Sequence, residues 1–444
     1  MKKEVQAQSV GDIVEINTGK EIIVGTLLES YEPSVILIKL NSGYNMGFEK
    51  DKIKSIKVVG KSTPSSLPEA DIKQNKNLPG ISMISTGGTI SSRLDYKTGG
   101  VKWLSKPEQV LALAPRMMNI VKINKIESPF MIASENMSAE NWIDMAKTAA
   151  KLLNEKENKG IIITHGTDTL HYTAAALSFM LKNLNKPVIL TYAQRSTDRG
   201  STDTSLNLTC AAYAALSNYA EVMLVGHASI NDNFCYALRG TKVRKMHASR
   251  RDTFRPINDL PLIKIFEDGK LEGMTQQYNT RDEKKKVTAD TEFEEKIALI
   301  KYYPGANFDI IDFYKNQGYK GIVIEATGLG HVGTEEAKYN WLPSIKSAID
   351  SGMTICFAPQ TFYGRLDPYV YAPGRELLKA GVIYLSDILP ETAYVKLGWV
   401  LGKTKNKAHD NINDPAQAQR IKELMLQNIA GEFNSQIQEK SFLF

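Results

Sequence analysis

The stretch ISMISTGGTI, residues 81–90, is the part of the chain from which the rest can be interpreted. Its first five residues are all apolar or small, as in a strand buried inside a parallel sheet. The glycines of TGGT at 86–89 then allow a sharp turn and a close approach of the backbone to a ligand, because they carry no Cβ atom. A hydroxyl group at the carboxyl end of a strand lies where open α/β sheets bind ligands, so Thr89 is a candidate nucleophile. The alternative is a glycine-rich turn in which the threonine is only hydrogen bonded.

The composition is that of a globular protein without a membrane span. The chain has 444 residues, of which 42% are hydrophobic and 23% charged, and this length allows roughly two or three domains. No apolar run reaches about 18 residues, and no apolar segment follows the first lysines as a signal peptide would require. The net charge of +6 permits contact with nucleic acid without requiring it. Three widely spaced cysteines argue against a disulfide framework and a cysteine metal site, and they favour a reducing, cytoplasmic location.

Residues 1–60 predict a small β-barrel domain, because short β-branched runs alternate with turn residues and little helix separates them. Its charges nearly balance, so a docking role is at least as well supported as nucleic-acid binding. The segment 61–79 is polar, carries three prolines and lacks an apolar period, which predicts an interdomain linker. The expected strands of the first domain lie at 13–16, 22–24, 35–40 and 53–59.

Strands and helices alternate from Gly80 onward, which predicts a doubly wound parallel sheet in an α/β domain spanning 80–275. Ser138 can cap one helix, and a second helix starting at Leu170 places Leu170, Ala174, Leu177 and Leu181 on one face. The expected strands lie at 161–164, 188–191 and 222–225.

The alternation stops near residue 260, and the charged run RDEKKK at 281–286 is typical of a solvated connection. We therefore expect an interdomain linker at 276–294 and a second, smaller α/β domain at 295–402. The last part, 403–444, predicts a helical extension. One helix in it carries Ile421, Leu424, Met425 and Ile429 on a common face.

A second loop, HGTDT at 165–169, also follows an apolar strand and precedes a helix. Because a helix N-terminus attracts a carboxylate or an oxyanion, Thr167 and Asp168 could share a pocket with Thr89. A Ser-His-Asp type triad is disfavoured, because His165 and Asp168 lie three apart on a tight loop and rarely align as base and orienting residue. His165 is better interpreted as a hydrogen-bonded packing residue, and its spacing of six from His171 does not suit a zinc pair.

The stretch 239–254 holds seven basic residues and one acidic residue. Its ordinary interpretation is a solvated face or a phosphate-binding patch. A lysine in it could instead serve as a base if an enclosed site lowers its pKa. A carboxylate such as Asp168 would oppose that change by favouring the charged form, and composition leaves the two alternatives open.

Two glycine motifs could suggest nucleotide binding. GLGHVG at 328–333 fits the dinucleotide fingerprint, with Asp350 about 20 residues further on. The motif GWVLGKT at 398–404 has three residues between its glycines, whereas a phosphate loop has four. It also ends a helical run instead of following a strand, so it is rejected as a phosphate loop.

Several motifs together resemble the bacterial-type L-asparaginase family. They begin with TGGTI at 86–90, HGTDT at 165–169 and RRDTF at 250–254. The family's lysine lies nine residues before a phenylalanine, which selects Lys245 and not Lys242. The resemblance covers roughly 80–402 and continues through YPG at 303–305, EATGLG at 325–330, PQTFYGRLDPYVY at 359–371 and PETAYVKLGWVLG at 390–402.

The resemblance implies that a threonine oxygen attacks the side-chain amide of asparagine or glutamine, releases ammonia and leaves an acyl-enzyme for water. Thr89 would be the nucleophile, and Tyr96 would help to remove its proton. Thr167, Asp168 and Lys245 would form a second group around the same substrate. Which threonine attacks is left open.

The same resemblance implies the substrate-binding residues, and it implies no metal. Ser134 and Glu135 match the segment that holds the α-carboxylate and amine of the substrate, and Gly166 belongs to the same set. Family members often carry glutamine where this chain has Glu135. The backbone N–H of Thr167 could stabilise the oxyanion, a contribution that can reach about 3 kcal/mol per donor.

The residues before 80 extend the resemblance, because ordinary asparaginases begin near the TGGTI strand. VGDIVEI, GTLLES and IKLNSGYNMG resemble the N-terminal domain of the D-subunit family of archaeal glutamyl-tRNA(Gln) amidotransferases. Membership implies that glutamine is hydrolysed here and that ammonia passes to a partner, the E subunit. That partner uses ATP and Mg²⁺ to amidate Glu-tRNA(Gln), so no cofactor is expected in this chain. Membership also implies a self-dimer within a D2E2 heterotetramer, in which the asparaginase-like bodies pair.

Three other functions fit part of these observations. The first is a stand-alone asparaginase or glutaminase with an extra N-terminal domain. The second is a non-catalytic scaffold or RNA-binding adaptor, against which the joint presence of the two threonines, the aspartate and the lysine argues. The third is an NAD enzyme, which the position of GLGHVG inside the family's C-terminal domain disfavours.

Overall fold

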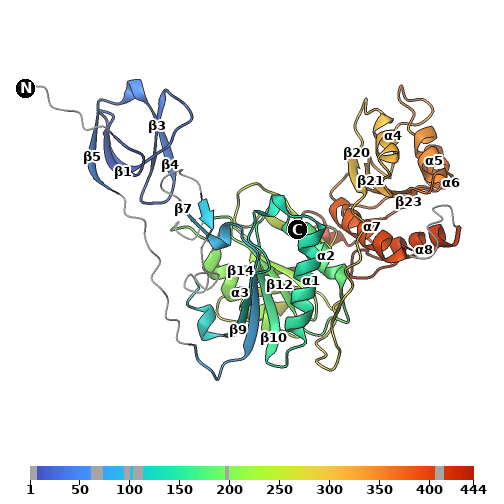
Figure 1. Ribbon diagram of the computed structural model, residues 1–444, viewed down its shortest axis with the longest axis horizontal. Coiled ribbons are helices and arrows are strands. Elements are labelled where there is room, and N and C mark those ends of the chain that lie inside the picture. The colour runs from blue at the N-terminus through green and yellow to red at the C-terminus, as the bar shows by residue number, and fades with distance from the viewer. Residues whose placement is uncertain (1–7, 62–73, 95–100, 104–113, 196–199, 406–414) are drawn as a thin grey trace, which may run out of the picture.

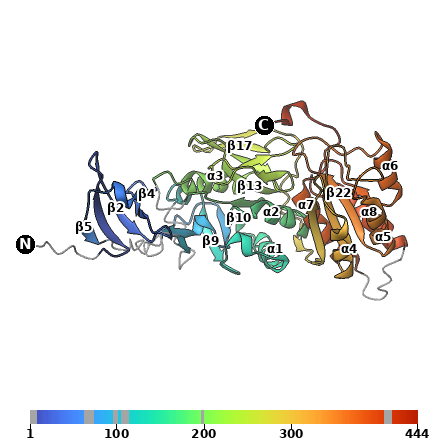
Figure 2. The same ribbon diagram turned by 90° about the horizontal axis from the view of Figure 1, so that it is seen from above.

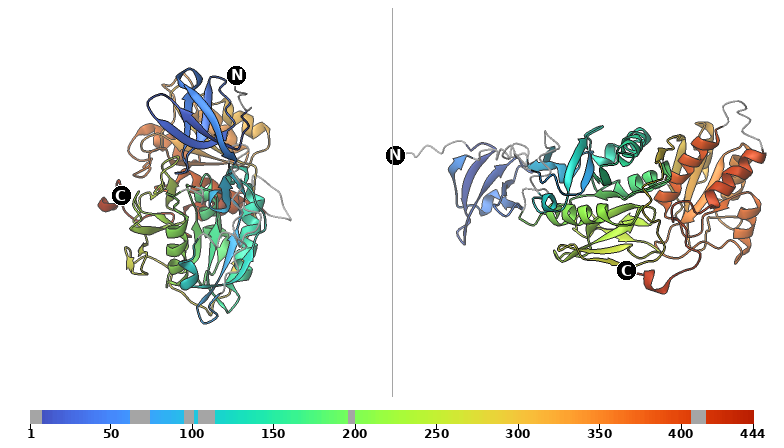
Figure 3. Two further views of the ribbon diagram at one scale, coloured as in Figure 1. Left: turned by 90° about the vertical axis from the view of Figure 1, so that its left-hand side faces the viewer. Right: turned by 90° about the horizontal axis from the view of Figure 1, so that it is seen from below.

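The computed structural model describes residues 8–61, 74–94, 101–103, 114–195, 200–405 and 415–444. A small N-terminal sheet, a central α/β domain and a second α/β domain follow one another along the long axis of the molecule (Figures 1 and 3). Tyr96 and most of the expected linker, residues 62–73, lie outside the described residues.

The N-terminal domain is an antiparallel sheet with the strand order β4-β3-β2-β1-β5. It curls around Val14, Ile16 and Ile38, which are fully buried, and this is the barrel-like β domain expected from the sequence. The strand β4 is not among those expected from the sequence, because NMGFE contains no β-branched residue and is largely exposed. The strands are β1 (Asp12–Asn17), β2 (Ile22–Leu28), β3 (Val35–Lys39), β4 (Asn45–Glu49) and β5 (Ser55–Lys61).

The central domain is built on a mixed sheet with the order β18-β17-β14-β13-β12-β10-β6-β9. The strands β9, β6, β10, β12 and β13 are parallel, as expected, whereas β14, β17 and β18 pair antiparallel. Antiparallel strands need no helical crossover, which explains why the alternation of strands and helices fades there. The strands are β6 (Gly80–Ser85), β9 (Lys122–Glu127), β10 (Asn158–Thr164), β12 (Val188–Thr191), β13 (Val222–His227), β14 (Phe234–Arg239), β17 (Ile263–Phe266) and β18 (Leu271–Gly273).

Helices cover both faces of this sheet. Ile161 and Ile163 pack in one core with α1 (Ala139–Leu153) and α2 (Leu170–Met180), and Ile162 packs in the other with α3 (Thr204–Leu216). The helix α1 begins after Ser138, as expected, and the Ser138 backbone N–H donates to the Asn141 side chain at 2.8 Å. The helix α2 begins at Leu170, as expected, and Leu170, Ala174, Leu177 and Leu181 lie in one core, but the helical assignment of Leu181 is wrong, because Leu181 belongs to a strand after α2. The helix is buried almost all round and not on one face alone.

Short two-stranded ladders are present in addition to the main sheet of the central domain. Of these, β15 (Val243–Lys245) and β16 (Phe254–Pro256) pair with each other and carry one of the predicted site residues. The other ladders join β7 (Ser92–Leu94) to β8 (Val101–Trp103) and β11 (Leu181–Lys182) to β19 (Thr288–Ala289).

The second α/β domain has a parallel sheet in the order β20-β21-β22-β23. Its helix α7 packs against α2 of the central domain (Figure 2), so α7 forms much of the contact between the two domains. The GKT motif lies inside α7, which agrees with its rejection as a phosphate loop. The elements are β20 (Ile297–Lys301), α4 (Asp309–Asn316), β21 (Gly321–Ala326), α5 (Leu342–Asp350), β22 (Thr354–Pro359), α6 (Ala372–Lys379), β23 (Ile383–Tyr384) and α7 (Pro390–Thr404).

The C-terminal segment folds back on α7. Its helix α8 (Pro415–Leu426) buries Ile421 and Met425. Ile429, which the sequence pattern assigned to the same helical face, lies beyond the end of the helix. An ion pair between Lys396 and Glu432, 2.6 Å long and fully buried, ties this segment to α7.

Candidate active site

Two loops meet side by side where the parallel strands β6 and β10 end. Their register pairs Ser85 with Thr164, so the residues that follow emerge at the same edge of the sheet. The backbone N–H and the hydroxyl of Thr86 both donate to the Thr164 carbonyl, at 3.2 and 3.0 Å. The Ile132 N–H donates to the Thr86 carbonyl at 3.1 Å, which brings in a third segment. Residues distant in sequence thus form one cluster of loops.

The glycines of these loops allow contacts that no other residue permits. Gly87 and Gly88 have φ values of +108° and +82°, which disfavour any side chain. A Cβ atom on Gly88 would lie 2.4 Å from the Gly166 Cα and backbone N. A Cβ atom on Gly166 would lie 2.8 Å from the Ser134 Oγ. The turn and the close approach expected from TGGT are therefore present, although the backbone approaches another loop of the chain.

Lys245 extends from β15 to the second loop. Its Nζ donates to Thr167 Oγ1 at 2.9 Å and to Asp168 Oδ1 at 2.7 Å. Thr167 is buried and the Lys245 side chain is 14% exposed, whereas the Asp168 side chain is 59% exposed. The group is thus accessible from one side. Lys242 points elsewhere and forms a buried ion pair with Asp387 at 2.8 Å.

Ser134 holds the second loop in place. Its Oγ accepts the Asp168 backbone N–H at 3.1 Å, and its carbonyl accepts the Thr169 hydroxyl at 2.6 Å. Glu135 follows on the same short turn and is exposed. The structure therefore brings Ser134, Gly166 and Thr167–Asp168 together, with the Glu135 side chain at the surface.

Thr89 begins a short 3₁₀ turn, Thr89–Ser91, directly after Gly88, and it is partly exposed. The contact between Gly88 and Gly166 puts Thr89 in the same cluster of loops as Thr167. Tyr96, the expected neighbour of Thr89, lies outside the described residues.

His165 is a packing residue, as the sequence favoured. It is fully buried, its Nδ1 lies 2.7 Å from the Gly166 carbonyl and its Nε2 lies 2.9 Å from the Thr173 hydroxyl. Since the Gly166 carbonyl can only accept, the neutral His165 ring carries its proton on Nδ1, and Nε2 accepts the Thr173 hydroxyl, whose oxygen accepts the Trp142 N–H. Burial lowers the pKa of His165 to about 4, so the ring is neutral at pH 7. Asp168 bonds to Lys245 and not to this ring, which argues against the triad.

The basic stretch 239–254 is a solvated face only at residues 246–250, which are exposed. Each of its lysines and arginines has a carboxylate within 3.5 Å, from several parts of the chain. The pairs are Arg239 with Glu221 and Asp259, Lys242 with Asp387, Arg244 with Glu391, Lys245 with Asp168, Arg250 with Asp252 and Arg251 with Asp232.

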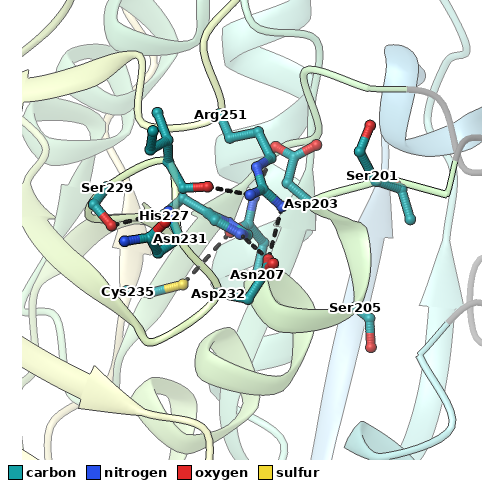
Figure 4. A network of polar contacts seen from close by, with 12 residues as sticks. Ser201, Asp203, Ser205, Asn207, His227, Ser229, Asn231, Asp232, Cys235 and Arg251 are labelled. Atoms are coloured by element: carbon teal, nitrogen blue, oxygen red, sulfur yellow. Dashed lines mark hydrogen bonds and ion pairs between the residues drawn. The ribbon is translucent and has the colours of Figure 1, made fainter. Parts of the chain in front are cut away.

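A polar network anchors the connection between β15 and β16. Figure 4 shows His227 and Arg251 converging on Asp232, with distances of 2.9 and 2.7 Å to its Oδ1. The other ring nitrogen of His227 lies 2.6 Å from Asn207 Oδ1, and Asn207 Nδ2 lies 3.3 Å from Asp203. Burial lowers the pKa of His227, and burial raises the pKa of Asp203. No local sequence pattern indicates this network, because its members come from three separate segments.

The GLGHVG motif does not form a dinucleotide site. Thr327 and His331 close a tight turn through two backbone hydrogen bonds of 3.0 and 2.9 Å. The next helix, α5, begins only at Leu342, so the glycines do not open a helix as the fingerprint requires.

Among the described residues, no group of three or more His, Cys, Asp and Glu side chains could hold a metal ion. Within the same part of the chain, no helix combines the length and apolarity that crossing a bilayer requires.

Comparison with known families gives three matches along the chain. They are the GatD N-terminal domain at residues 8–59, the asparaginase N-terminal domain at 80–279 and the glutaminase/asparaginase C-terminal domain at 296–410.

Curated relatives match over nearly the full length. The D subunit of glutamyl-tRNA(Gln) amidotransferase from Pyrococcus furiosus is 47% identical, with 98% of this chain and 97% of that protein covered. The D subunit from Methanopyrus kandleri is 39% identical, with 96% and 91% covered.

Solved structures match the two α/β domains. The thermostable L-asparaginase from Thermococcus kodakarensis is 26% identical with a TM-score of 0.69, and the match covers 80% of this chain and 100% of that one. L-asparaginase I from Vibrio cholerae is 26% identical with a TM-score of 0.66, covering 80% and 99%.

Proposed function

The chain belongs to the family of D subunits of glutamyl-tRNA(Gln) amidotransferase, and we propose that it hydrolyses glutamine with Thr89, Thr167, Asp168 and Lys245. As a member of this family it is the asparaginase-like, glutamine-hydrolysing component of the amidotransferase. The observation that carries the site assignment is the contact of Lys245 Nζ with both Thr167 and Asp168.

The proposed reaction is acyl transfer to a threonine. A threonine hydroxyl is a weak nucleophile until a neighbouring group removes its proton. Lys245 Nζ lies within hydrogen-bond reach of Thr167 Oγ1, which suits proton transfer between them. Thr89, assisted by Tyr96, attacks the amide carbon, ammonia leaves, and the Thr167–Asp168–Lys245 group activates the water that hydrolyses the acyl-enzyme. Ser134, Glu135 and Gly166 hold the α-carboxylate and amine of the substrate.

The ammonia passes to the E subunit, which uses ATP and Mg²⁺ to convert Glu-tRNA(Gln) to Gln-tRNA(Gln) in the cytoplasm. This chain needs no cofactor for its own half-reaction, and two copies pair within a D2E2 heterotetramer. The name of the relatives, which denotes one component of an amidotransferase, supports a multisubunit enzyme.

We extend the proposal to the division of labour along the chain. The domain at 1–60 docks on a partner, the domain at 80–275 carries the site, the domain at 295–402 completes it and the extension 403–444 stabilises the fold. The extents of the three family matches, 8–59, 80–279 and 296–410, support the bounds of the first three of these parts.

A stand-alone asparaginase or glutaminase is the second candidate, because the solved structures that match the two α/β domains are L-asparaginases. It differs from the first in needing neither a partner nor tRNA.

Ammonia release separates the two functions. It is measured with glutamine and with asparagine, using the chain alone, the chain with the E subunit, and both with Glu-tRNA(Gln). Stimulation by the partner and charged tRNA, lost in Thr89→Ala and Lys245→Ala, is the expected result. Full activity alone with no response to the partner would favour the stand-alone enzyme. Glu272→Gln, which removes an exposed charge, is the matched control.

A further inference from the structure

The carboxylate of Glu391 comes from the second α/β domain, yet it adjoins both segments that supply the Thr167–Asp168–Lys245 group. Its Oε1 accepts Arg244 Nη2 at 3.0 Å, and Arg244 directly precedes Lys245. The same Oε1 lies 4.0 Å from Nε2 of His171, in the first turn of the helix that follows Asp168.

The strand geometry makes the contact between Arg244 and Glu391 relevant to Lys245. Successive side chains of a strand point to opposite faces, so Arg244 faces the second domain while Lys245 faces Asp168. In the described residues β15 pairs only with β16, through a ladder of Val243–Lys245 with Phe254–Pro256. A ladder this short, separate from the main sheet, holds a strand weakly, so side-chain anchors have a large influence on its position.

Two further contacts join the residues just before this strand to the same part of the second domain. The Thr392 hydroxyl donates to the Thr241 carbonyl at 3.1 Å, and Lys242 pairs with Asp387 at 2.8 Å. The segment 241–244 is therefore bound at successive positions to the segment 387–392, and Lys245 is the next residue.

Among the described residues, Arg244 is the one cation that neutralises the Glu391 carboxylate through an ion pair. Burial, followed by the positive charges of Arg244 and Lys245, lowers the pKa of His171 to about 3. His171 is therefore neutral at pH 7, and its 4.0 Å contact with Glu391 is not an ion pair. Glu391 is 6% exposed, and its Oε2 has no hydrogen-bond partner among the residues that the structure describes. Arg244 also lies 4.8 Å from the centre of the Phe362 ring, which fixes its guanidinium on a second side.

We propose that Glu391 is a positioning residue that holds Arg244 and thereby fixes Lys245 against Thr167 and Asp168. The second domain thus sets the geometry of a site built from the first. This inference rests on the proposed role of Lys245 in amide hydrolysis.

The test compares two buried glutamates that form ion pairs at opposite ends of α7. Glu391 lies in the first turn of α7 and pairs with Arg244, whereas Glu294 is 8% exposed and pairs with Lys405, at the end of the helix, over 3.0 Å. Glu391→Gln should lower kcat for ammonia release by about 10- to 100-fold with KM changed less than about threefold, because small displacements of a catalytic group cost that much. Glu294→Gln should lower the unfolding temperature but leave kcat of the folded protein within about threefold.

A double-mutant cycle tests whether the effect passes through Arg244. Arg244→Gln should lower kcat as Glu391→Gln does, and the double variant should be no slower than the slower single variant. A further readout needs no activity: amide hydrogen exchange of residues 243–245 should accelerate in Glu391→Gln and not in Glu294→Gln.

If activity is lost in Lys245→Ala, which supports the proposed function, then equal kcat in wild type and Glu391→Gln, or an equal fall in Glu294→Gln, would overturn the positioning role alone. Wild-type activity that survives Lys245→Ala, or no wild-type activity with partner and tRNA present, would instead refute the proposed function and this inference with it.

Discussion

Gly88 and Gly166 touch through their backbones: a Cβ atom on Gly88 would lie 2.4 Å from the Gly166 Cα and nitrogen. They come from two loops that are separated in sequence but follow adjacent parallel strands, β6 and β10. Their contact sets the spacing between Thr89 on one loop and Thr167 on the other. A fold that separated them by the width of a methyl group would change that spacing.

Gly88→Ala should therefore reduce ammonia release by at least about 100-fold, because it displaces one loop from the other. Gly305→Ala is the matched control, since Gly305 has φ +85° against +82° for Gly88 but nothing within 4 Å of a Cβ. It should cost only about 1–2 kcal/mol of stability for the left-handed backbone and leave kcat unchanged. Equal kinetic losses in the two variants would contradict the close-approach explanation.

Loss of Lys245 should mainly lower kcat, whereas loss of Lys242 should mainly lower the stability of the fold. Lys245→Ala should lower kcat by about 10²- to 10⁴-fold, the range for a general acid or base, with a small change in unfolding temperature. Lys242→Ala leaves Asp387 buried without its ion-pair partner, so it should lower the free energy of unfolding by about 3–5 kcal/mol. Denaturant titration and steady-state kinetics on both variants check this. A Lys242→Ala protein of normal stability, or an active Lys245→Ala, would count against it.

The position of the covalent intermediate shows which of the two threonines attacks the substrate. If Thr89 attacks, Thr167→Ala should accumulate a γ-glutamyl ester on the peptide that contains Thr89, because deacylation slows. Thr89→Ala should show no ester, and Thr89→Ser should keep partial activity through its hydroxyl. Rapid quenching followed by peptide mass spectrometry locates the ester. An ester on Thr167 would reverse the assigned roles.

Buried histidines should make the fold sensitive to acid. His165 titrates near pH 4 in the folded protein, against a reference value of 6.5 for the unfolded chain. Between these values the unfolded chain binds more protons, so the free energy of unfolding falls as the pH drops from about 6.5 to about 4, by up to roughly 3 kcal/mol. His171 acts in the same direction. Urea unfolding at several pH values should show a shallower dependence for His165→Gln than for wild type, and an unchanged slope would contradict it.

Much of the fold could be predicted from local sequence patterns. Apolar runs of strand length marked β10, β12 and β13, and Ser138 marked the start of α1. The errors arose where local signals are weak. The strand β4 is exposed and lacks β-branched residues, and the antiparallel strands after β13 need no helical crossover. Leu181 leaves α2 because it pairs with Ala289, more than 100 residues away.

The sequence alone determined the loops of the site, because their chemistry is local. Glycines at 87 and 88 adopt the positive φ angles that the turn requires, and a strand before each loop puts Thr89 and Thr167 at one edge of the sheet. Only the tertiary structure decided what the basic stretch does. Lys245 reaches Asp168 across 77 residues and Lys242 reaches Asp387 across 145. Composition shows the charges of such a stretch, but the pairing of each charge depends on which strand face it occupies and on what the second domain places opposite it.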